Sequence, residues 1–124
     1  MNIYTKFVAR LQLDKAIREA EEAHHKDGDR YYVMPTFNGT KGKPVLIILN
    51  RFNFRKLRHK GYIKPQAKII DLLNECFYFT AQRDGTGYMD KHAKEVKRAS
   101  YFSWYEAERK AIKANKKRLR KNKR

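Results

Sequence analysis

Two short apolar segments near the middle of the chain restrict its fold more than any other feature. Residues 30–36 and 44–50 read RYYVMPT and PVLIILN, which are rich in the aromatic and β-branched residues typical of strands. Residues 37–43, FNGTKGK, are Gly- and Asn-rich turn material between them. The pattern predicts an antiparallel hairpin with a long loop. Pro35 and Pro44 near its turn end indicate that one strand lies at a sheet edge.

The segment before the hairpin has the pattern of a helix. In LDKAIREAEEAHHKDG, residues 13–28, apolar residues share one side, Asp14 can serve as N-cap, and Gly28 lies where a left-handed C-terminal residue belongs. Ile3, Phe7 and Leu11 also have helical spacing. We therefore predict a helix ending at Gly28, with an earlier helical stretch before Asp14.

Directly after the hairpin, residues 50–63 read NRFNFRKLRHKGYI. Asn50 or Asn53 can cap a helix that runs to Lys60, and Gly61 can adopt the left-handed conformation that ends it. Tyr62 is then placed to fold back onto the helix. The apolar residues of this segment are expected to face the hairpin; these are Phe52, Phe54 and Leu57.

Residues 64–80, KPQAKIIDLLNECFYFT, predict a buried helix with Pro65 near its start, followed by an end segment or a short third strand at 77–80. The expected buried side chains are Ile69, Leu72, Leu73, Cys76 and Phe77. Residues 90–99 are weakly helical. Ser103 and Glu106 match a capping box that would open a further helix reaching Ile112.

The predicted fold is therefore a single small α+β domain, because 124 residues suit one domain. A β-hairpin, with a short third strand as an option, is packed by three or four helices. Beyond Ile112 the amphipathic pattern fails, since KANKKRLRKNKR has one large apolar residue. We divide the chain into a compact domain, 1–108, and a basic C-terminal tail or helix extension, 109–124.

The net charge of +17 is concentrated in two blocks without acidic residues. Residues 51–68 hold 7 Lys or Arg, and residues 109–124 hold 10. Charges are nearly balanced elsewhere. Two concentrated basic blocks are the electrostatic footprint of a polyanion binder, whereas uniform basicity could be a solubility device.

The first block carries the candidate contacts on one helix face. Arg51, Arg55 and Arg58 recur at spacings of four and three, which predicts one exposed stripe with Lys56 and Lys60 beside it. A solvated helix face is the other interpretation of this stripe. Exposed aromatic residues can stack unpaired bases, and Tyr62 and Tyr105 are the candidates. In the tail the candidate contacts are Lys113, Lys116, Lys117, Arg118, Arg120, Lys121, Lys123 and Arg124.

Metal, cofactor and nucleophile signatures are weak. The loop at 37–43 lacks the P-loop spacing, and adjacent His24 and His25 cannot chelate as an i, i+4 pair would. Glu95-Val96-Lys97, with Asp84 or Asp90 upstream, is similar to the two carboxylates and lysine of restriction-type nucleases. That set normally lies on a hairpin, whereas these residues are expected to be helical. We predict no cofactor and no metal site. The single cysteine, among apolar neighbours, is expected to be inert.

The expected function is non-catalytic nucleic-acid binding of low sequence specificity, to DNA or RNA. One alternative is a structural component of a larger assembly, viral or ribosome-like, whose tail threads into partner chains or packaged nucleic acid. A second is a small RNA-cleaving toxin, because metal-independent toxins work with Lys, Arg and Tyr. No membrane partner is expected, since the longest apolar run, 44–49, has strand length. Without a leader-like start, a cytoplasmic location is expected, or incorporation into a virion.

Overall fold

The computed structural model describes residues 1–36 and 44–122, with side chains as far as Lys121. The predicted loop at 37–43 and the candidate contacts Lys123 and Arg124 lie outside the described residues. The elements are α1 (Ile3–Asp27), β1 (Tyr32–Pro35), β2 (Leu46–Leu49), α2 (Phe54–His59), the 3₁₀ turn η1 (Ile69–Asp71), α3 (Leu72–Glu75), β3 (Tyr78–Phe79) and α4 (Lys91–Asn122). The predicted α+β class is confirmed.

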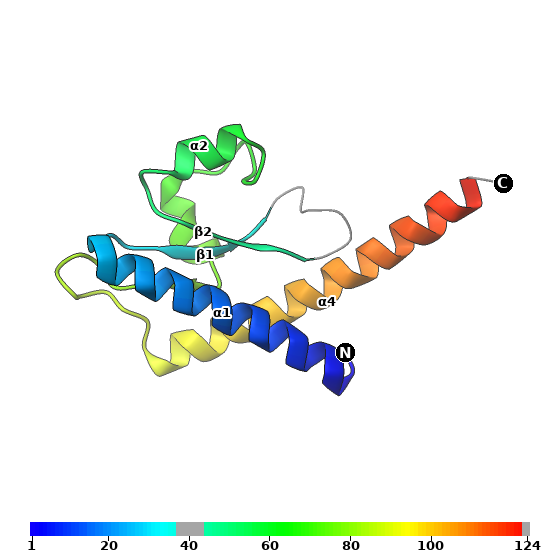
Figure 1. The fold of residues 1–124 in the computed structure, drawn as a ribbon, viewed down its shortest axis with the longest axis horizontal. Coiled ribbons are helices and arrows are strands. Elements are labelled where there is room, and N and C mark those ends of the chain that lie inside the picture. Colours follow the sequence, from blue (N-terminus) through cyan, green and yellow to red (C-terminus); the bar gives the residue numbers. More distant parts are fainter. Residues whose placement is uncertain (37–43, 123–124) are drawn as a thin grey trace.

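The described elements form three layers around a small antiparallel sheet with the strand order β2-β1-β3. Helices α1 and α4 cover one face of the sheet, and α2 with α3 covers the other (Figure 1). The hairpin and the short third strand are therefore confirmed. Strand β2 lies at the edge, next to Pro44, as the prolines predicted.

Alternation along the strands divides the core in two. In β1, Val33 faces the α1/α4 side, whereas Tyr32 and Met34 face the α2/α3 side. The register keeps each layer together, because Val33 pairs with Ile48 and Met34 pairs with Ile47. Successive strand residues point to opposite faces, so both layers obtain apolar side chains from the same four-residue strands.

Helix α1 is one helix of 25 residues. Its N-cap is Asn2, whose side chain accepts a hydrogen bond of 2.7 Å from the backbone N–H of Thr5. The predicted N-cap at Asp14 is wrong: Asp14 lies inside the helix and pairs with Arg98 of α4 at 3.2 Å. Gly28 ends α1 in the left-handed conformation at φ 80°, which confirms the predicted stop.

Helix α2 ends as its sequence predicts. Gly61 has φ 87°, and the N–H of Tyr62 donates to the carbonyl of Leu57 at 3.1 Å, which is the backbone pattern of a Schellman motif. The start differs, because the side chain of Asn53 makes no capping bond within the helix. Instead Asn50 accepts from the backbone N–H groups of Phe52 and Asn53.

The buried helix predicted for residues 64–77 is wrong. Only η1 and the single turn of α3 form, and Ile69 and Leu73 are exposed. The chain leaves the helical conformation at Cys76, because the residues after it form backbone hydrogen bonds to the chain around β1 instead of helical ones. The N–H of Phe77 donates to Val33 at 2.8 Å, and that of Thr80 donates to Tyr31 at 3.0 Å.

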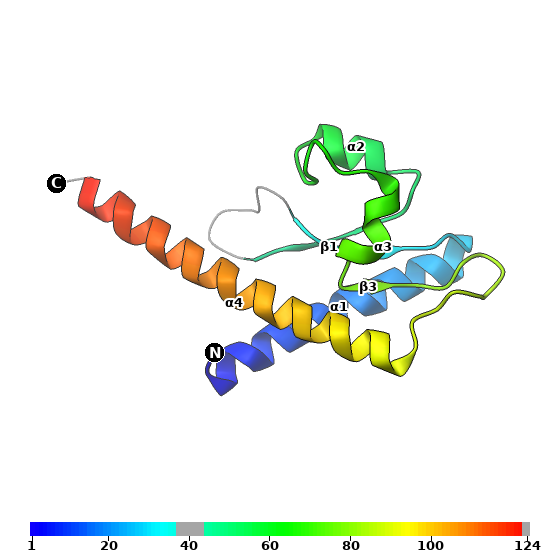
Figure 2. The same cartoon turned by 180° about the vertical axis from the view of Figure 1, so that it is seen from behind.

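Helix α4 is continuous from Lys91, so the capping box predicted at Ser103 and Glu106 is wrong. The side chain of Asp90 accepts from the N–H of Ala93 at 2.7 Å and caps the true start. Glu106 instead lies near the N-terminal amine, at 3.6 Å. The helix passes the predicted boundary at 108/109 without a break, and its last turns project beyond the other described elements (Figure 2). The division into domain and extension stays a prediction.

Candidate functional site

Three adjoining hollows line the side of the molecule formed by α2 and the segments next to it. The first, of about 350 Å³, lies between Arg30, Arg83 and Phe52. The second, of about 530 Å³, shares Arg51 and Phe52 with the first. The third, of about 400 Å³, shares Arg55 and Arg58 with the second. We call this series of hollows the basic groove.

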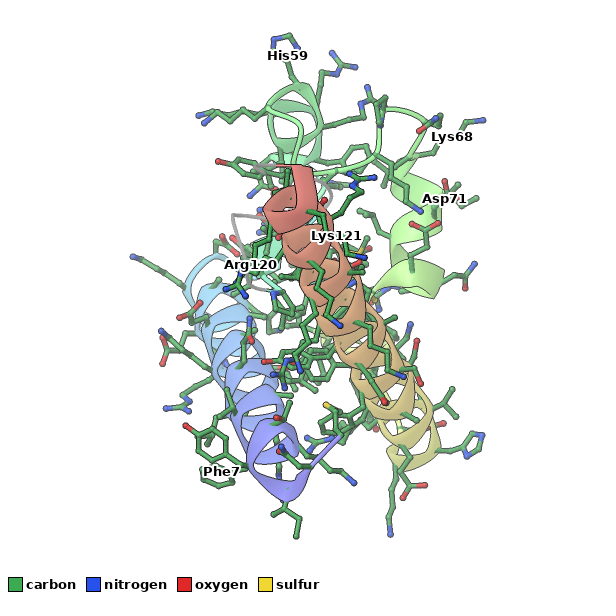
Figure 3. All side chains as sticks on the ribbon, turned by 90° about the vertical axis from the view of Figure 1, so that its right-hand side faces the viewer. Phe7, His59, Lys68, Asp71, Arg120 and Lys121 are labelled. Atoms are coloured by element: carbon green, nitrogen blue, oxygen red, sulfur yellow. The ribbon has the colours of Figure 1, made fainter. Side chains whose placement is uncertain are left out.

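Positive charge dominates the lining of the basic groove. Its acidic lining residue is Asp29, which Arg83 neutralises with an ion pair of 2.7 Å. Figure 3 shows His59 at the outer end of α2 and Lys68 on the segment before η1, both turned outward. The cationic and imidazole side chains of the groove come from four separate parts of the chain; they are Arg30, Arg51, Arg55, Arg58, His59, Lys68 and Arg83.

Two of these arginines are held rigidly. The guanidinium of Arg30 donates to the carbonyls of Thr80 at 3.1 Å and Gly87 at 2.6 Å. Arg58 donates to the carbonyl of Ala67 at 3.0 Å and lies 5.4 Å from the centre of the Phe54 ring. These bonds fix one side of each guanidinium, so both groups shape the groove as well as charge it.

Arg51 and Arg55 are exposed and available to a ligand. Within the described residues neither has an ion pair. The guanidinium of Arg51 lies 4.8 Å from the centre of the Phe52 ring, which leaves its N–H groups free to point into the groove. An arginine whose donors have no protein acceptor is suited to bidentate contact with a phosphate.

Phe52 is the groove residue that the sequence analysis misplaced. It was predicted to face the hairpin, but 66% of its surface is exposed, and it borders two of the three hollows. The reason is the Asn50 turn: its side-chain oxygen accepts from Phe52 and Asn53 at 3.0 and 2.9 Å and holds this backbone outside the helix. The sequence Asn-x-Phe-Asn at 50–53 could have indicated this turn, because Asn side chains accept hydrogen bonds from the backbone of turns.

The structure brings together only part of the predicted stripe. Arg51, Arg55 and Arg58 meet in the groove, whereas Lys56 and Lys60 are exposed but do not line its hollows. Tyr62 is 40% exposed, outside the groove.

Tyr105, the other stacking candidate, is only 6% exposed and packs in the core with Tyr101, so it is wrong as a base contact. Arg30, Lys68 and Arg83 were not predicted as groove residues, because tertiary folding brings them there from distant segments.

The exposed end of α4 forms a second basic surface. Because 3.6 residues make one turn, its spacings of three and four place five cations on one face. We call this face the tail stripe; it consists of Lys113, Lys116, Lys117, Arg120 and Lys121. The remaining described candidate contact of the tail, Arg118, donates to the side-chain oxygen of Asn115 at 3.2 Å. Figures 1 and 2 show the end of α4 well separated from α2, so the tail stripe and the basic groove are distinct surfaces.

Two of the residues considered for catalysis, Lys97 and Cys76, have structural surroundings. The ammonium of Lys97 donates to the carbonyls of Leu73 at 2.9 Å and Cys76 at 2.8 Å, at the C-terminal end of α3. Cys76 is 2% exposed, and this burial raises the pKa of its thiol. His24 and His25 are adjacent on α1, with ring centres 5.8 Å apart. Among residues 1–36 and 44–122, no three His, Cys, Asp or Glu side chains are grouped to hold a metal ion.

None of the helices described is both long enough and apolar enough to cross a membrane. No protein-family model, curated protein or solved structure matches the chain.

Proposed function

We propose that this protein binds nucleic acid mainly through phosphates, with low sequence specificity, using the basic groove and the tail stripe as two contact surfaces. The observation that carries the proposal is the series of hollows lined by Arg30, Arg51, Arg55, Arg58 and Arg83. Arginines of one sign around connected hollows strengthen the local field, and a chain of phosphates is the polyanion that fits an elongated surface of this kind.

Low specificity is expected from the groove lining. Phosphate contacts position a protein on nucleic acid, whereas base edges are read by bidentate Asn, Gln or Arg side chains. Arg30 and Arg58 already donate to backbone carbonyls. Gln82 is the one amide side chain among the lining residues of the described hollows. Phe52 offers an exposed aromatic face that accepts any unpaired base. We therefore expect binding to depend on charge and strand geometry more than on sequence.

The decisive experiment is a salt series of equilibrium binding to single- and double-stranded DNA and RNA of one length. The full chain is compared with a version that ends at Ala111, and with a full-length variant in which Lys113, Lys117 and Lys121 become Gln. For duplex DNA, we expect the slope of log K against log[salt] to flatten by about 0.9 for each phosphate contact removed. Circular dichroism checks that both variants remain folded.

No binding above background at ~0.15 M salt would sink the proposal. The same samples distinguish binding from the RNA-cleaving alternative, because a toxin would shorten the RNA during incubation, whereas a binder returns it intact.

A structural role in a larger assembly is the second candidate function. It is supported by a separate observation, the exposed apolar side chains of α1, among which Ile3 is 89% exposed and Tyr4 is 75% exposed. Protein surfaces with such patches commonly contact other chains.

A further inference from the structure

The first three turns of α1 are apolar on two opposite sides. The inward side is buried against the sheet and α4; it contains Ala9 and Leu13. At 100° per residue, Phe7 and Leu11 lie about 160° away from the centre of the buried side, and Ile3 lies about 120° away. A solvent-facing helix normally keeps its outer side polar, but here exposed Lys6 and Arg10 lie at one edge and the outer side itself is apolar. This half of α1 therefore has the composition of a helix covered on both sides.

We call the outward apolar residues the outer α1 face; they are Ile3, Tyr4, Phe7, Val8 and Leu11. Their exposed fractions are 89%, 75%, 58%, 38% and 52%. With about 150–250 Å² for each aromatic side chain, the face exposes on the order of 600 Å² of apolar surface. That is the upper end for a monomer and approaches the ~800 Å² per partner of a standard protein interface. Figure 3 shows Phe7 on the side of α1 turned away from α4.

The outer α1 face has a definite end. Farther along the helix, the outward positions hold exposed Arg18, Glu22 and His25, and Asp14 beside them pairs with Arg98 of α4. The apolar surface is therefore one patch, three turns long, with Phe7 at its centre and apolar residues four positions away on each side. Such a patch is self-complementary: an antiparallel second helix crossing at Phe7 would place Ile3 of each copy against Leu11 of the other.

We propose that a second copy of this chain covers the outer α1 face, forming an isologous dimer whose twofold axis passes beside Phe7. The symmetry of the patch about Phe7 and its area both match what such a dimer requires. The inference stands on α1 alone and does not depend on nucleic-acid binding. Dimerisation would bring two basic grooves and two tail stripes into one particle, and both could then engage the same polyanion.

The positive charge of the chain predicts how dimerisation depends on salt. Each copy carries +17, so like-charge repulsion opposes association while apolar burial drives it. Added salt screens the repulsion and leaves the apolar contact intact. Dimerisation should therefore tighten as salt rises, which is opposite to the salt dependence expected for nucleic-acid binding.

Sedimentation velocity on the full chain at about 0.1 and 0.5 M NaCl tests this directly. We expect a dimer that is tighter at the higher salt and at least about tenfold weaker in Phe7→Glu. The matched control is Val96→Glu, because Val96 is also an exposed apolar residue on a helix, at 55%. A monomer at every protein concentration up to ~100 μM, or equal weakening by both variants, overturns the proposal.

Cysteine cross-linking tests the register. Under mild oxidation, Phe7→Cys should form an intermolecular disulfide faster than Val96→Cys, because the twofold axis places the two new thiols together. Ile3→Cys should cross-link rapidly only when mixed with Leu11→Cys. Native Cys76 is buried and gives little background. Equal rates for all pairs overturn the register. A monomer that binds anionic phospholipid vesicles through Phe7 overturns the dimer and assigns the face to a membrane surface.

Discussion

Replacing Arg51 and Arg55 with Gln isolates the contribution of the basic groove to nucleic-acid binding. Both side chains are exposed, and neither has an ion pair within the described part of the chain. Their loss should therefore leave the fold unchanged. Arg58 is a poorer choice, because it donates to the carbonyl of Ala67 and its replacement would also remove a structural bond.

The magnitude follows from counterion release. Each phosphate contact with duplex DNA contributes about 0.9 to the slope of log K against log[salt], so losing two contacts should flatten the slope by about 1.8. The electrostatic contribution vanishes near 1 M salt. At ~0.15 M the same two contacts correspond to an affinity loss of about 30-fold, and at ~0.05 M to a loss of about 200-fold. For single strands, with about 0.7 per contact, the change in slope should be about 1.4.

Fluorescence anisotropy with a labelled oligonucleotide, at five or more salt concentrations, measures both quantities. The matched control is Lys91→Gln with Lys94→Gln, which removes the same charge from exposed positions at the start of α4, far from α2 in Figure 1. Its slope should remain close to that of the unmodified protein. An unchanged slope in the groove variant, or an equal change in both variants, would refute the reasoning and return the α2 stripe to an ordinary solvated surface.

Three further predictions concern stability. Lys97→Met removes the bonds to the Leu73 and Cys76 carbonyls and should lower the free energy of unfolding in urea by about 1.5–3 kcal/mol, whereas exposed Lys94→Met should change it by less than about 0.5 kcal/mol. Gly87→Ala and Gly85→Ala both strain a positive φ, but only at Gly87 would the new methyl overlap the Arg30 side chain, so Gly87→Ala should have the lower thermal midpoint. The pKa of Tyr78 is raised, mainly because its side chain is partly buried and also because its hydroxyl donates a hydrogen bond to Glu21. Because the unfolded side chain ionises first, stability should be complete below about pH 10 and fall above it, and Tyr78→Phe should lessen that fall in urea titrations at about pH 9 and 11.

The local parts of the fold could be predicted from sequence because short-range patterns encode them. The aromatic and β-branched content of 30–36 and 44–50 predicted two strands, and their antiparallel pairing confirms it. Gly28 and Gly61 predicted two helix ends, since a left-handed residue there costs glycine little. The helical conformation stops at Cys76 because the N–H groups of Phe77 and Thr80 bond to Val33 and Tyr31, which no local pattern reports.

The candidate site divides in the same way. Arg55 and Arg58 of the basic groove follow from the helical spacing of α2, whereas Arg51 lies in the turn before that helix; the tail stripe follows from the composition of the last residues. The outward position of Phe52 depends on the side chain of Asn50, a single competing hydrogen-bond acceptor. Tyr105 was expected at the surface, but its ring is buried in the core, where it packs against Tyr101 of the same helix.

The sequence by itself determined where positive charge is concentrated, because charge is a property of residues and needs no fold to accumulate in a block. It also determined the hairpin, since strand-forming composition and a Gly- and Asn-rich segment between two such runs are properties of neighbouring residues. Tertiary structure alone decided which cations share a surface: Arg30 and Arg83 reach the groove through β1 and the loop after β3. Tertiary structure also determined that the outer α1 face is exposed. The sheet and α4 pack against only one side of that helix and leave the other side uncovered.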